Sequence, residues 1–345
     1  MKTYKKFKYN KKCSLKGTNY GGDKIKKVLL IILSILVILG CYIILEFKNN
    51  IKLVDFNKVK LEDSNLEKGA PQIETWGIIS LGIEKYRKEG PTEKIKVAIL
   101  DSGINKQHED LINTVSKEYN AIEPGKPVED DFGHGTVIAG VIAAQDNDYG
   151  IVGIAPNVDL YSVKILDDKG AGSIEALNRG IQWCIDNKVQ IINLSFGTSE
   201  NNTQLQNSIK KAINANILVV AASGNKFGLE PDYPAKYEDV FSVTAVNNNY
   251  KVKPRYSATG KVDYSLPGIS VLSTSKDGGY AKYSGTSIAS AHLTGILALI
   301  LENHIMFNID LNEDNLRQKI IDILKDYSID LGEKSIYGNG FIKLS

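Results

Sequence analysis

A repeated alternation of strand-like and helix-like segments constrains the fold of this chain more than any other feature. Short runs of continuous apolar residues, bounded by turn residues, alternate with longer segments of helical pattern. The predicted strands are residues 95–100, 159–165, 190–194, 217–222 and 240–246, and the predicted helices are residues 134–144, 173–187, 203–215, 286–303 and 312–324. Strands that are apolar throughout belong in a parallel sheet covered on both faces. We therefore predict an α/β fold: a three-layer, doubly wound, mostly parallel sheet with helices on both faces.

A second apolar segment, residues 28–45, lies outside this pattern. It has no charged residue, is long enough to span a hydrocarbon core, and follows a tail rich in lysine. The positive-inside rule then places the N-terminus in the cytoplasm and the rest of the chain outside, as a single-pass cell-membrane protein with an extracellular domain. An uncleaved signal anchor is the favoured interpretation. A cleaved signal peptide and a lipoprotein signal ending at Cys41 remain alternatives.

Composition sets the domain organisation and excludes some functions. The chain has 345 residues, 43% of them hydrophobic and 24% charged, and a net charge of +2. We predict a basic cytoplasmic tail (1–27), a transmembrane anchor (28–45), a polar linker without a folded pro-domain (46–70) and one globular domain (71–345). The lysines gather beside the apolar segment, which fits topology signalling and not nucleic-acid binding. Three widely spaced cysteines form neither a disulfide framework nor a zinc site, and Cys184 is expected in the core.

Three short motifs carry residues suited to nucleophilic catalysis. Asp101 ends the first predicted strand, His134 stands between two glycines at a helix start, and Ser287 opens an apolar helix. Serine needs a base to remove its proton, histidine has the ordinary pKa for that base, and a carboxylate can orient the histidine. Each residue alone has a simpler explanation, as a turn residue, a helix cap or an N-cap respectively. The order Asp, His, Ser in an α/β chain is much less readily explained by chance.

These motifs resemble those of the subtilisin-type serine proteases, and the resemblance runs from about Gln72 to the C-terminus. It covers the stretches 97–104, 134–140 and 285–292, although Ile288 and Ala291 replace the usual Met and Pro. Subtilisin has the same Asp, His, Ser order. The resemblance implies that Asp101 orients His134, that His134 is general base and then general acid, and that Ser287 attacks the carbonyl. It also implies that Asn225, in a Gly-Asn turn after a strand, donates to the oxyanion.

The resemblance further implies how a peptide would bind. The family adds its substrate as a strand between two chain segments, which here correspond to Gly170, Ala171 and Gly172 and to Ser195, Phe196 and Gly197. Asp232 stands where broad-specificity relatives carry glycine, at the base of the primary specificity pocket. A carboxylate there favours cleavage after Arg or Lys. The alternative is that Asp232 turns to solvent. By the same resemblance, Tyr233–Pro234 is expected to be a cis bond.

A structural Ca²⁺ site is also implied by the resemblance. The segment after the His helix matches the family's calcium loop, together with one residue near the domain start and one after the Asp motif. All the expected ligand atoms are oxygens, which suits Ca²⁺. The alternative is an acidic surface loop. The expected ligands are Gln72, Asp110, Gln145, Asn147, Tyr149 and Ile151.

The sequence thus predicts a membrane-anchored, monomeric serine endopeptidase that acts through an acyl-enzyme. Restricted specificity, tethering and the missing pro-domain suggest a processing protease, of the kind that removes leader peptides. A broad-specificity degradative subtilase is the alternative, and a catalytically idle subtilase-like binding module is a third. A different hydrolase of the α/β-hydrolase plan is disfavoured, because its serine sits in a Gly-x-Ser-x-Gly elbow ahead of the histidine.

Overall fold

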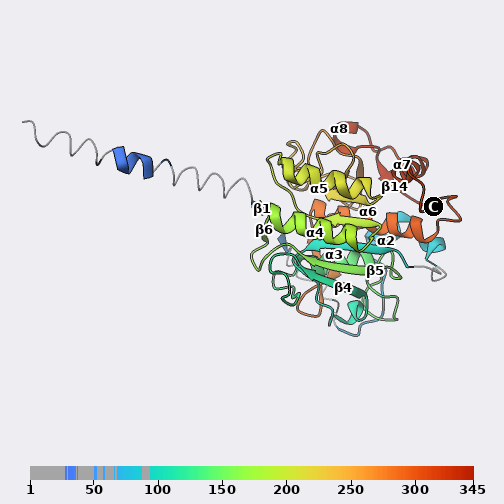
Figure 1. Ribbon diagram of the computed structural model, residues 1–345. Coiled ribbons are helices and arrows are strands. Elements are labelled where there is room, and N and C mark those ends of the chain that lie inside the picture. The colour runs from blue at the N-terminus through green and yellow to red at the C-terminus, as the bar shows by residue number, and fades with distance from the viewer. Residues whose placement is uncertain are drawn as a thin grey trace, which may run out of the picture. The chain divides into compact units, whose positions relative to one another are not determined.

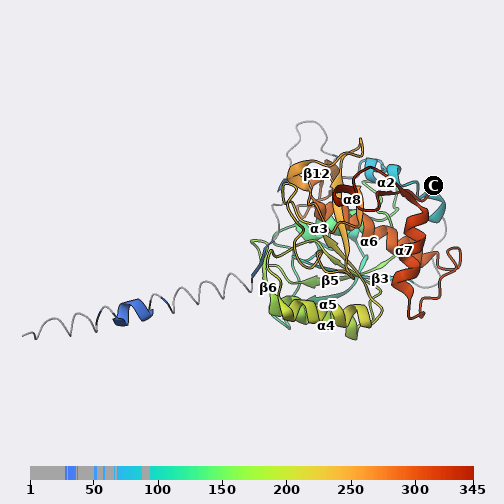
Figure 2. The same cartoon turned by 90° about the horizontal axis from the view of Figure 1, so that it is seen from above.

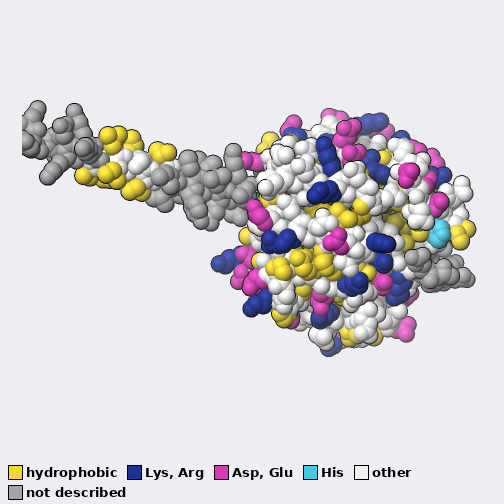
Figure 3. Space-filling model, in the orientation of Figure 1, with side chains coloured by type: hydrophobic (Ala, Val, Ile, Leu, Met, Phe, Trp, Pro, Cys, Tyr) yellow, Lys and Arg dark blue, Asp and Glu magenta, His cyan; other side chains and the backbone are white. Residues whose placement is uncertain are grey.

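The computed structural model describes residues 28, 30–35, 37, 50–52, 57–58, 66, 68–87 and 94–345. The chain divides into two units, Met1–Lys48 and Asn49–Ser345. In the first unit, the described residues between 28 and 37 are helical and their apolar side chains are exposed (Figure 3). None of the helices in the described part of the chain combines the length and the apolar character that a membrane crossing requires. The tail 1–27 and the rest of the predicted span lie outside the described residues.

A seven-stranded sheet forms the centre of the second unit (Figure 1). Every pair of neighbouring strands in it is parallel, as the continuous apolar runs predict. Strand β3 lies in the interior of this sheet, between β7 and β5, so the residue that ends β3 opens onto the middle of the sheet edge. The strand order is β10 (Tyr264–Pro267), β9 (Phe241–Val246), β8 (Leu218–Ala222), β7 (Ile191–Leu194), β3 (Lys96–Asp101), β5 (Asp159–Lys164) and β4 (Val115–Asn120).

Helices cover both faces of the sheet (Figure 2). Helices α4 (Ile174–Asp186) and α5 (Thr203–Asn214) lie on one face, and α3 (His134–Ala143) and α6 (Thr286–Glu302) lie on the other. Strand β3 shows why two cores form. Its alternate side chains point to opposite faces: Val97 packs in the core on the α3 and α6 side, and Ala98 packs in the core on the α4 and α5 side. The predicted three-layer α/β fold is confirmed.

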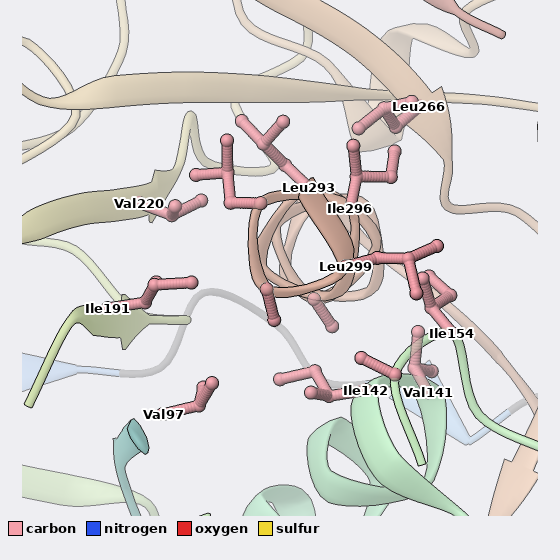
Figure 4. Packing of buried hydrophobic residues seen from close by; sticks show 14 of the residues in the cluster. Val97, Val141, Ile142, Ile154, Ile191, Val220, Leu266, Leu293, Ile296 and Leu299 are labelled. Atoms are coloured by element: carbon pink, nitrogen blue, oxygen red, sulfur yellow. The ribbon is translucent and has the colours of Figure 1, made fainter. Parts of the chain in front are cut away.

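Helix α6 is the most buried element of the molecule. Every residue from Thr286 to Leu301 is buried, and Figure 4 shows the helix surrounded by apolar side chains from the sheet and from α3. Burying one such aliphatic side chain contributes roughly 1.5–3 kcal/mol. A helix held on all sides in this way keeps its first turn, which carries Ser287, in a fixed position.

Shorter elements surround this core. Strands β11 (Val271–Thr274), β12 (Tyr280–Ser284) and β2 (Asn57–Lys58) form a three-stranded antiparallel sheet. Strand β1 (Asn50–Lys52) pairs with β6 (Ala171–Ser173), and β13 (Ser328–Ile329) pairs with β14 (Phe341–Ile342). The remaining helices are α2 (Trp76–Leu81), α7 (Leu316–Asp326) and α8 (Lys334–Tyr337), with short 3₁₀ turns at Glu84–Tyr86, Glu109–Leu111 and Pro254–Tyr256.

The predicted interior elements end within one residue of the observed ones, apart from α7, which starts at Leu316 and not at 312. Several strands were not predicted, namely β4, β6 and β10 to β14. The structure also has β1 and β2, which lie inside the segment 46–70 that we predicted to be a linker. Polar composition does not prevent a short segment from pairing with an open sheet edge.

Candidate active site

Asp101 and His134 meet in the interior of the domain. Strand β3 carries Asp101 at its carboxyl end, and α3 begins at His134. The His134 Nδ1 atom lies 2.9 and 2.8 Å from the two carboxylate oxygens of Asp101, and both side chains are 1% exposed. The backbone amide of Ser102 also donates to Asp101 Oδ1, at 2.8 Å. Because a carboxylate can only accept, Nδ1 carries the ring proton of a neutral His134, and Nε2 is the basic nitrogen.

A second carboxylate, Asp130, which the sequence analysis missed, links the loop after β3 to the start of α3. Asp130 Oδ2 accepts from the backbone amide of Thr136 at 2.9 Å, in the first turn of α3. Its Oδ1 accepts from Ser102 Oγ at 2.6 Å, which links this helix to the loop after β3. The backbone of α3 at Gly135 packs closely against the loop after β3, because a Cβ atom on Gly135 would lie 2.0 Å from the carbonyl oxygen of Gly103. The sequence feature that could have indicated this role is the position of Asp130 in a polar loop just before a helix.

Ser287 lies inside the first turn of α6 and does not cap it. The N-cap position belongs to Gly285, where no side-chain cap is made, so the interpretation of Ser287 as an N-cap is wrong. Ser287 is 9% exposed. A Cβ atom on Gly285 would lie 3.1 Å from Ser287 Oγ and 3.4 Å from Asn225 Nδ2. The hydroxyl and the amide therefore border the same small space, which an added side chain would fill.

The amide of Asn225 has a defined orientation. Its Oδ1 accepts from the backbone amide of Thr286 at 3.0 Å. The hydroxyl of Thr286 accepts in turn from the backbone amide of Gly224 at 3.1 Å. Since a backbone N–H can only donate, the atom that faces Thr286 is the oxygen, and the NH₂ group occupies the side near Ser287. This arrangement places two hydrogen-bond donors, the Asn225 amide and the N-terminal backbone of α6, beside the hydroxyl.

A buried polar network anchors the start of α6 to the sheet. Ser195 Oγ donates to Asn193 Oδ1 at 2.7 Å and lies 3.1 Å from Ser290 Oγ. Ser290 Oγ donates to the carbonyl of Ser287 at 2.8 Å, and Asn193 Nδ2 donates to Thr294 Oγ1 at 2.9 Å. Sequence reasoning did not predict this network. Its signal was a polar stripe at helical spacing on an otherwise apolar helix.

The first predicted substrate edge is already paired with the chain itself. Strand β6 contains Ala171 and Gly172, and Gly170 precedes it. Strand β1 pairs antiparallel with β6 and places Ile51 opposite Gly172. Strand β2 pairs antiparallel with β12 and places Asn57 opposite Ser284, shortly before Ser287. Segment 50–58 therefore pairs at two places close to the predicted substrate site.

The second predicted substrate edge follows β7. Ser195 turns its hydroxyl into the buried network, and the Phe196 side chain is 1% exposed in the core. Thr198 exchanges two backbone hydrogen bonds with Tyr233, at 2.8 and 2.9 Å. The backbone of this segment is therefore the part that could pair with a peptide, and the Asp232 side chain packs directly against Gly197.

Asp232 does not turn to solvent. It is 3% exposed, so the alternative of a solvent-facing turn residue is wrong. Its carboxylate is not an open charge, however: Lys226 Nζ lies 3.0 Å from Asp232 Oδ1. Nothing in the sequence pattern had indicated that pairing. The Tyr233–Pro234 bond is cis, as the resemblance implied.

The three segments of the predicted calcium site come together. Asn147 Nδ2 donates to Asp110 Oδ1 at 3.3 Å, and Gln72 Oε1 accepts from the backbone amides of Asn147 and Asp148. Burial raises the pKa of Asp110, which is the electrostatic situation that a nearby cation relieves. Within the described residues, no donor reaches the carbonyl oxygens of the other predicted ligands, Gln145, Tyr149 and Ile151. Oxygen atoms of this kind are the ligands that Ca²⁺ prefers, but the side-chain oxygens of Gln72 and Asn147 already accept from backbone amides. Among the described residues there is no cluster of three or more His, Cys, Asp or Glu side chains that could hold a metal, so the Ca²⁺ site stays a prediction.

Comparison with known proteins supplies the family. Residues 92–340 match the model of the subtilase family. A thermostable alkaline protease of Halalkalibacterium halodurans is 36% identical over 293 residues, which cover 84% of this chain and 78% of that protein. Subtilisin E of Bacillus subtilis is 34% identical over 289 residues, 82% of this chain and 74% of that protein. Subtilisin of Bacillus pumilus is 35% identical over 274 residues, 78% of this chain and 96% of that protein.

Proposed function

The chain belongs to the subtilase family of serine endopeptidases, and from this premise we propose that Ser287, His134 and Asp101 carry out the hydrolysis of its peptide substrates. The observation that most supports this assignment is the buried pair of Asp101 and His134, with Nδ1 bonded to the carboxylate at 2.8 Å. The pair fixes the ring with Nε2 as the basic nitrogen. A purely structural histidine would not require that orientation.

The proposed reaction proceeds through an acyl-enzyme. His134 Nε2 takes the proton of the Ser287 hydroxyl while the oxygen attacks the substrate carbonyl. Asp101 stabilises the imidazolium that forms. The NH₂ group of Asn225 and the backbone N–H of Ser287 donate to the oxyanion, His134 passes its proton to the leaving amine, and water then releases the acyl group by the same route.

Covalent labelling tests the assignment of the nucleophile. A fluorophosphonate probe is expected to label the full chain, and labelling is expected to vanish in Ser287→Ala. The matched control is Ser284→Ala, three residues earlier in the same motif, which keeps the labelling. Absent labelling of a folded wild-type chain would reject the catalytic assignment and favour the alternative of an idle binding module.

The membrane assignment rests on the sequence and on the first unit. The run 28–45 lacks charge, and its described residues expose their apolar side chains. A signal anchor would tether the domain 71–345 at the outer face of the cell membrane, with the tail 1–27 in the cytoplasm. Membrane fractionation of producing cells, followed by N-terminal sequencing, tests this. Recovery of a soluble chain that starts beyond residue 45 would indicate a cleaved signal, and a lipid-modified Cys41 would indicate a lipoprotein.

A tethered, monomeric protease of restricted specificity fits the processing of exported peptides. Asp232 supports a preference for Arg or Lys before the cleaved bond, because its carboxylate is buried beside Gly197. Its pairing with Lys226 weakens that preference and leaves the broad-specificity alternative in place. Cleavage of matched peptides that differ only at that residue tests the two readings. A preference for Phe or Leu over Arg would favour the degradative role.

Bound Ca²⁺ would have a structural role. Asp110 and the side chains of Gln72 and Asn147 would hold it, together with the carbonyls after α3. Its charge would offset the buried carboxylate and tie the start of the domain to the loop after the candidate His134 helix. The reaction steps proposed above do not involve the ion.

A further inference from the structure

Lys164 is a buried lysine that the proposed reaction does not use. It ends β5 and lies opposite Asp101, which ends the neighbouring strand β3. Matched residues of adjacent strands point to the same face of a sheet, so both side chains point to the face that α3 and α6 cover. Only 8% of Lys164 is exposed. A buried ammonium group is stable only when acceptors satisfy its protons, so its partners show which parts of the chain it holds.

The ammonium group of this lysine joins two loops. Lys164 Nζ donates to the carbonyl of Ser102 at 2.8 Å and to the carbonyl of Glu129 at 2.7 Å. It also lies 3.4 Å from a carboxylate oxygen of Asp131, whose side chain is exposed. Ser102 directly follows Asp101, whereas the other two acceptors belong to the loop that leads into α3. One cation therefore holds the loop after β3 against the loop before α3.

Each of the two loops carries one member of the candidate catalytic pair. On the first loop, the backbone amide of Ser102 donates to Asp101 Oδ1 at 2.8 Å. On the second loop, Asp130 accepts from the backbone amide of Gly133 at 2.7 Å, and α3 begins with His134 directly afterwards. The distance between the carboxylate and the imidazole therefore depends on how the two loops are held together, and the buried ammonium group lies at their junction.

The carbonyl of Ser102 depends on this lysine for its hydrogen bond. Ser102 is fully buried, and within the described part of the chain no other donor bonds its carbonyl. Without the ammonium group, this acceptor would be satisfied only if the loops moved apart and admitted water. Such a movement would displace the carboxylate from the imidazole, and a misplacement of about 1 Å can cost about 10²-fold in rate.

We propose that Lys164 is a positioning residue, whose ammonium group keeps Asp101 and His134 at bonding distance by holding together the loops that carry them. This inference rests on the proposed peptidase function, because the pair matters for the reaction only if it activates Ser287. The bonds of the ammonium group go to these two loops and not to either predicted substrate edge. Its loss is therefore expected to lower kcat and to leave KM nearly unchanged.

Steady-state kinetics of the full chain with one peptide substrate test the proposal. Lys164→Met removes the charge and keeps the apolar stem, so kcat is expected to fall about 10²-fold with little change in KM. Lys164→Arg keeps a cation with several donors, so it should recover most of the lost kcat. The matched control is Lys261→Met. Lys261 Nζ also donates to a backbone carbonyl, that of Val240, and to a carboxylate oxygen of Asp263, but it joins other parts of the chain, so kcat should stay at the wild-type value.

Proton NMR separates a failure of this proposal from a failure of the proposed function. In a Ser287→Ala background, the Nδ1 proton of His134, bonded to Asp101 at 2.8 Å, is expected to give a resonance far downfield of the amide protons. Lys164→Met should shift or broaden this resonance, and Lys261→Met should leave it in place. If the resonance changes in this way while the wild type hydrolyses no peptide, the positioning role stands and the proposed function fails.

A folded Lys164→Met variant with the kcat of an active wild type, or with an unchanged resonance, would overturn the proposal. An equal loss of kcat in Lys261→Met would also overturn it, because general destabilisation would then explain both losses. If Lys164→Met does not fold, Lys164→Gln decides, because its shorter and uncharged side chain cannot reach both carbonyls. A wild-type resonance in that variant rejects the role of Lys164.

Discussion

Asn225 is the residue whose contribution can be measured most directly. Its Oδ1 is held by the Thr286 amide at 3.0 Å, and its NH₂ lies beside the space above Gly285. Asn225→Ala is therefore expected to lower kcat with little effect on KM, because the lost donor acts on the oxyanion and not on the ground state. Subtilisin, the reference enzyme for this effect, loses about 10²–10³-fold in kcat. A change confined to KM would contradict the assignment.

His292 is the residue that should make the fold sensitive to acid. Its Nδ1 donates to the Ile288 carbonyl at 2.8 Å, and within the described residues its buried Nε2 has no partner. The Gly77 backbone packs against the ring, since a Cβ there would lie 2.4 Å from Nε2. Burial lowers the pKa of His292 to about 4. The neutral ring is thus the form that the folded state accepts.

The sign of the pH effect follows from this shift. The unfolded chain binds the proton below its ordinary pKa of about 6.5, whereas the folded chain does not until about pH 4. The contribution of His292 to the free energy of unfolding is therefore constant above about pH 6.5 and falls by about 3 kcal/mol as the pH drops to 4. Urea unfolding at pH 7.5 and 5 is expected to show a smaller acid loss for His292→Gln than for wild type. Equal losses would assign the acid sensitivity to other groups.

At the scale of elements, the pairing of β1 with β6 bears on substrate access. A peptide that adds to the edge at Gly172 must displace residues 50–52, because one strand edge accepts one partner. Ile51→Pro removes a backbone donor from β1 and weakens this pairing. We expect the apparent KM for peptides to fall about fivefold, which corresponds to about 1 kcal/mol of lost pairing, with kcat unchanged.

The comparison variant for this element is Asn57→Pro, which disturbs the pairing of β2 with Ser284 and leaves β1 in place. If both variants lower KM equally, segment 50–58 acts as a unit. A wild-type KM in Ile51→Pro would show that β1 does not compete with substrate.

At the scale of the whole molecule, the predicted calcium site links distant parts of the chain. Gln72, Asp110 and Asn147 come from three separate segments, so an ion held by them would stabilise the folded state alone. EDTA is expected to lower Tm by about 5–10 °C, measured in the Ser287→Ala variant to avoid self-digestion. Asn147→Ala should reduce this response. A Tm unaffected by EDTA in the wild-type loop would mean that the loop does not hold Ca²⁺.

The distribution of charge differs between the visible face of the domain and the N-terminal stretch of the sequence. Figure 3 shows basic and acidic side chains interspersed over the visible face, with no single-sign field. The lysine-rich stretch of the sequence lies in residues 1–27, ahead of the apolar segment. The prediction that residues 1–27 set membrane topology rests on that lysine-rich stretch.

The sequence by itself determined the layered fold and indicated the candidate catalytic residues. Strand β3 and helix α6 follow from local patterns, because continuous apolar runs need burial on both faces and a short Gly-led turn begins a helix. Asp101, His134 and Ser287 stand at the ends of such elements, where their motifs are continuous in the chain. Such local sequence patterns can be recognised without knowing which segments of the chain contact one another in the fold.

Only the tertiary structure decided the contacts between distant segments. The Asp130 link to Ser102 and the pairing of β1 with β6 join residues far apart in the chain, and the pairing of Lys226 with Asp232, six residues away, depends on how the loop between them folds. An ion pair or a strand edge selects its partner by distance and direction after folding, and sequence spacing encodes neither. For that reason the sequence could indicate the candidate catalytic motifs, whereas it could not indicate that Lys226 pairs with Asp232.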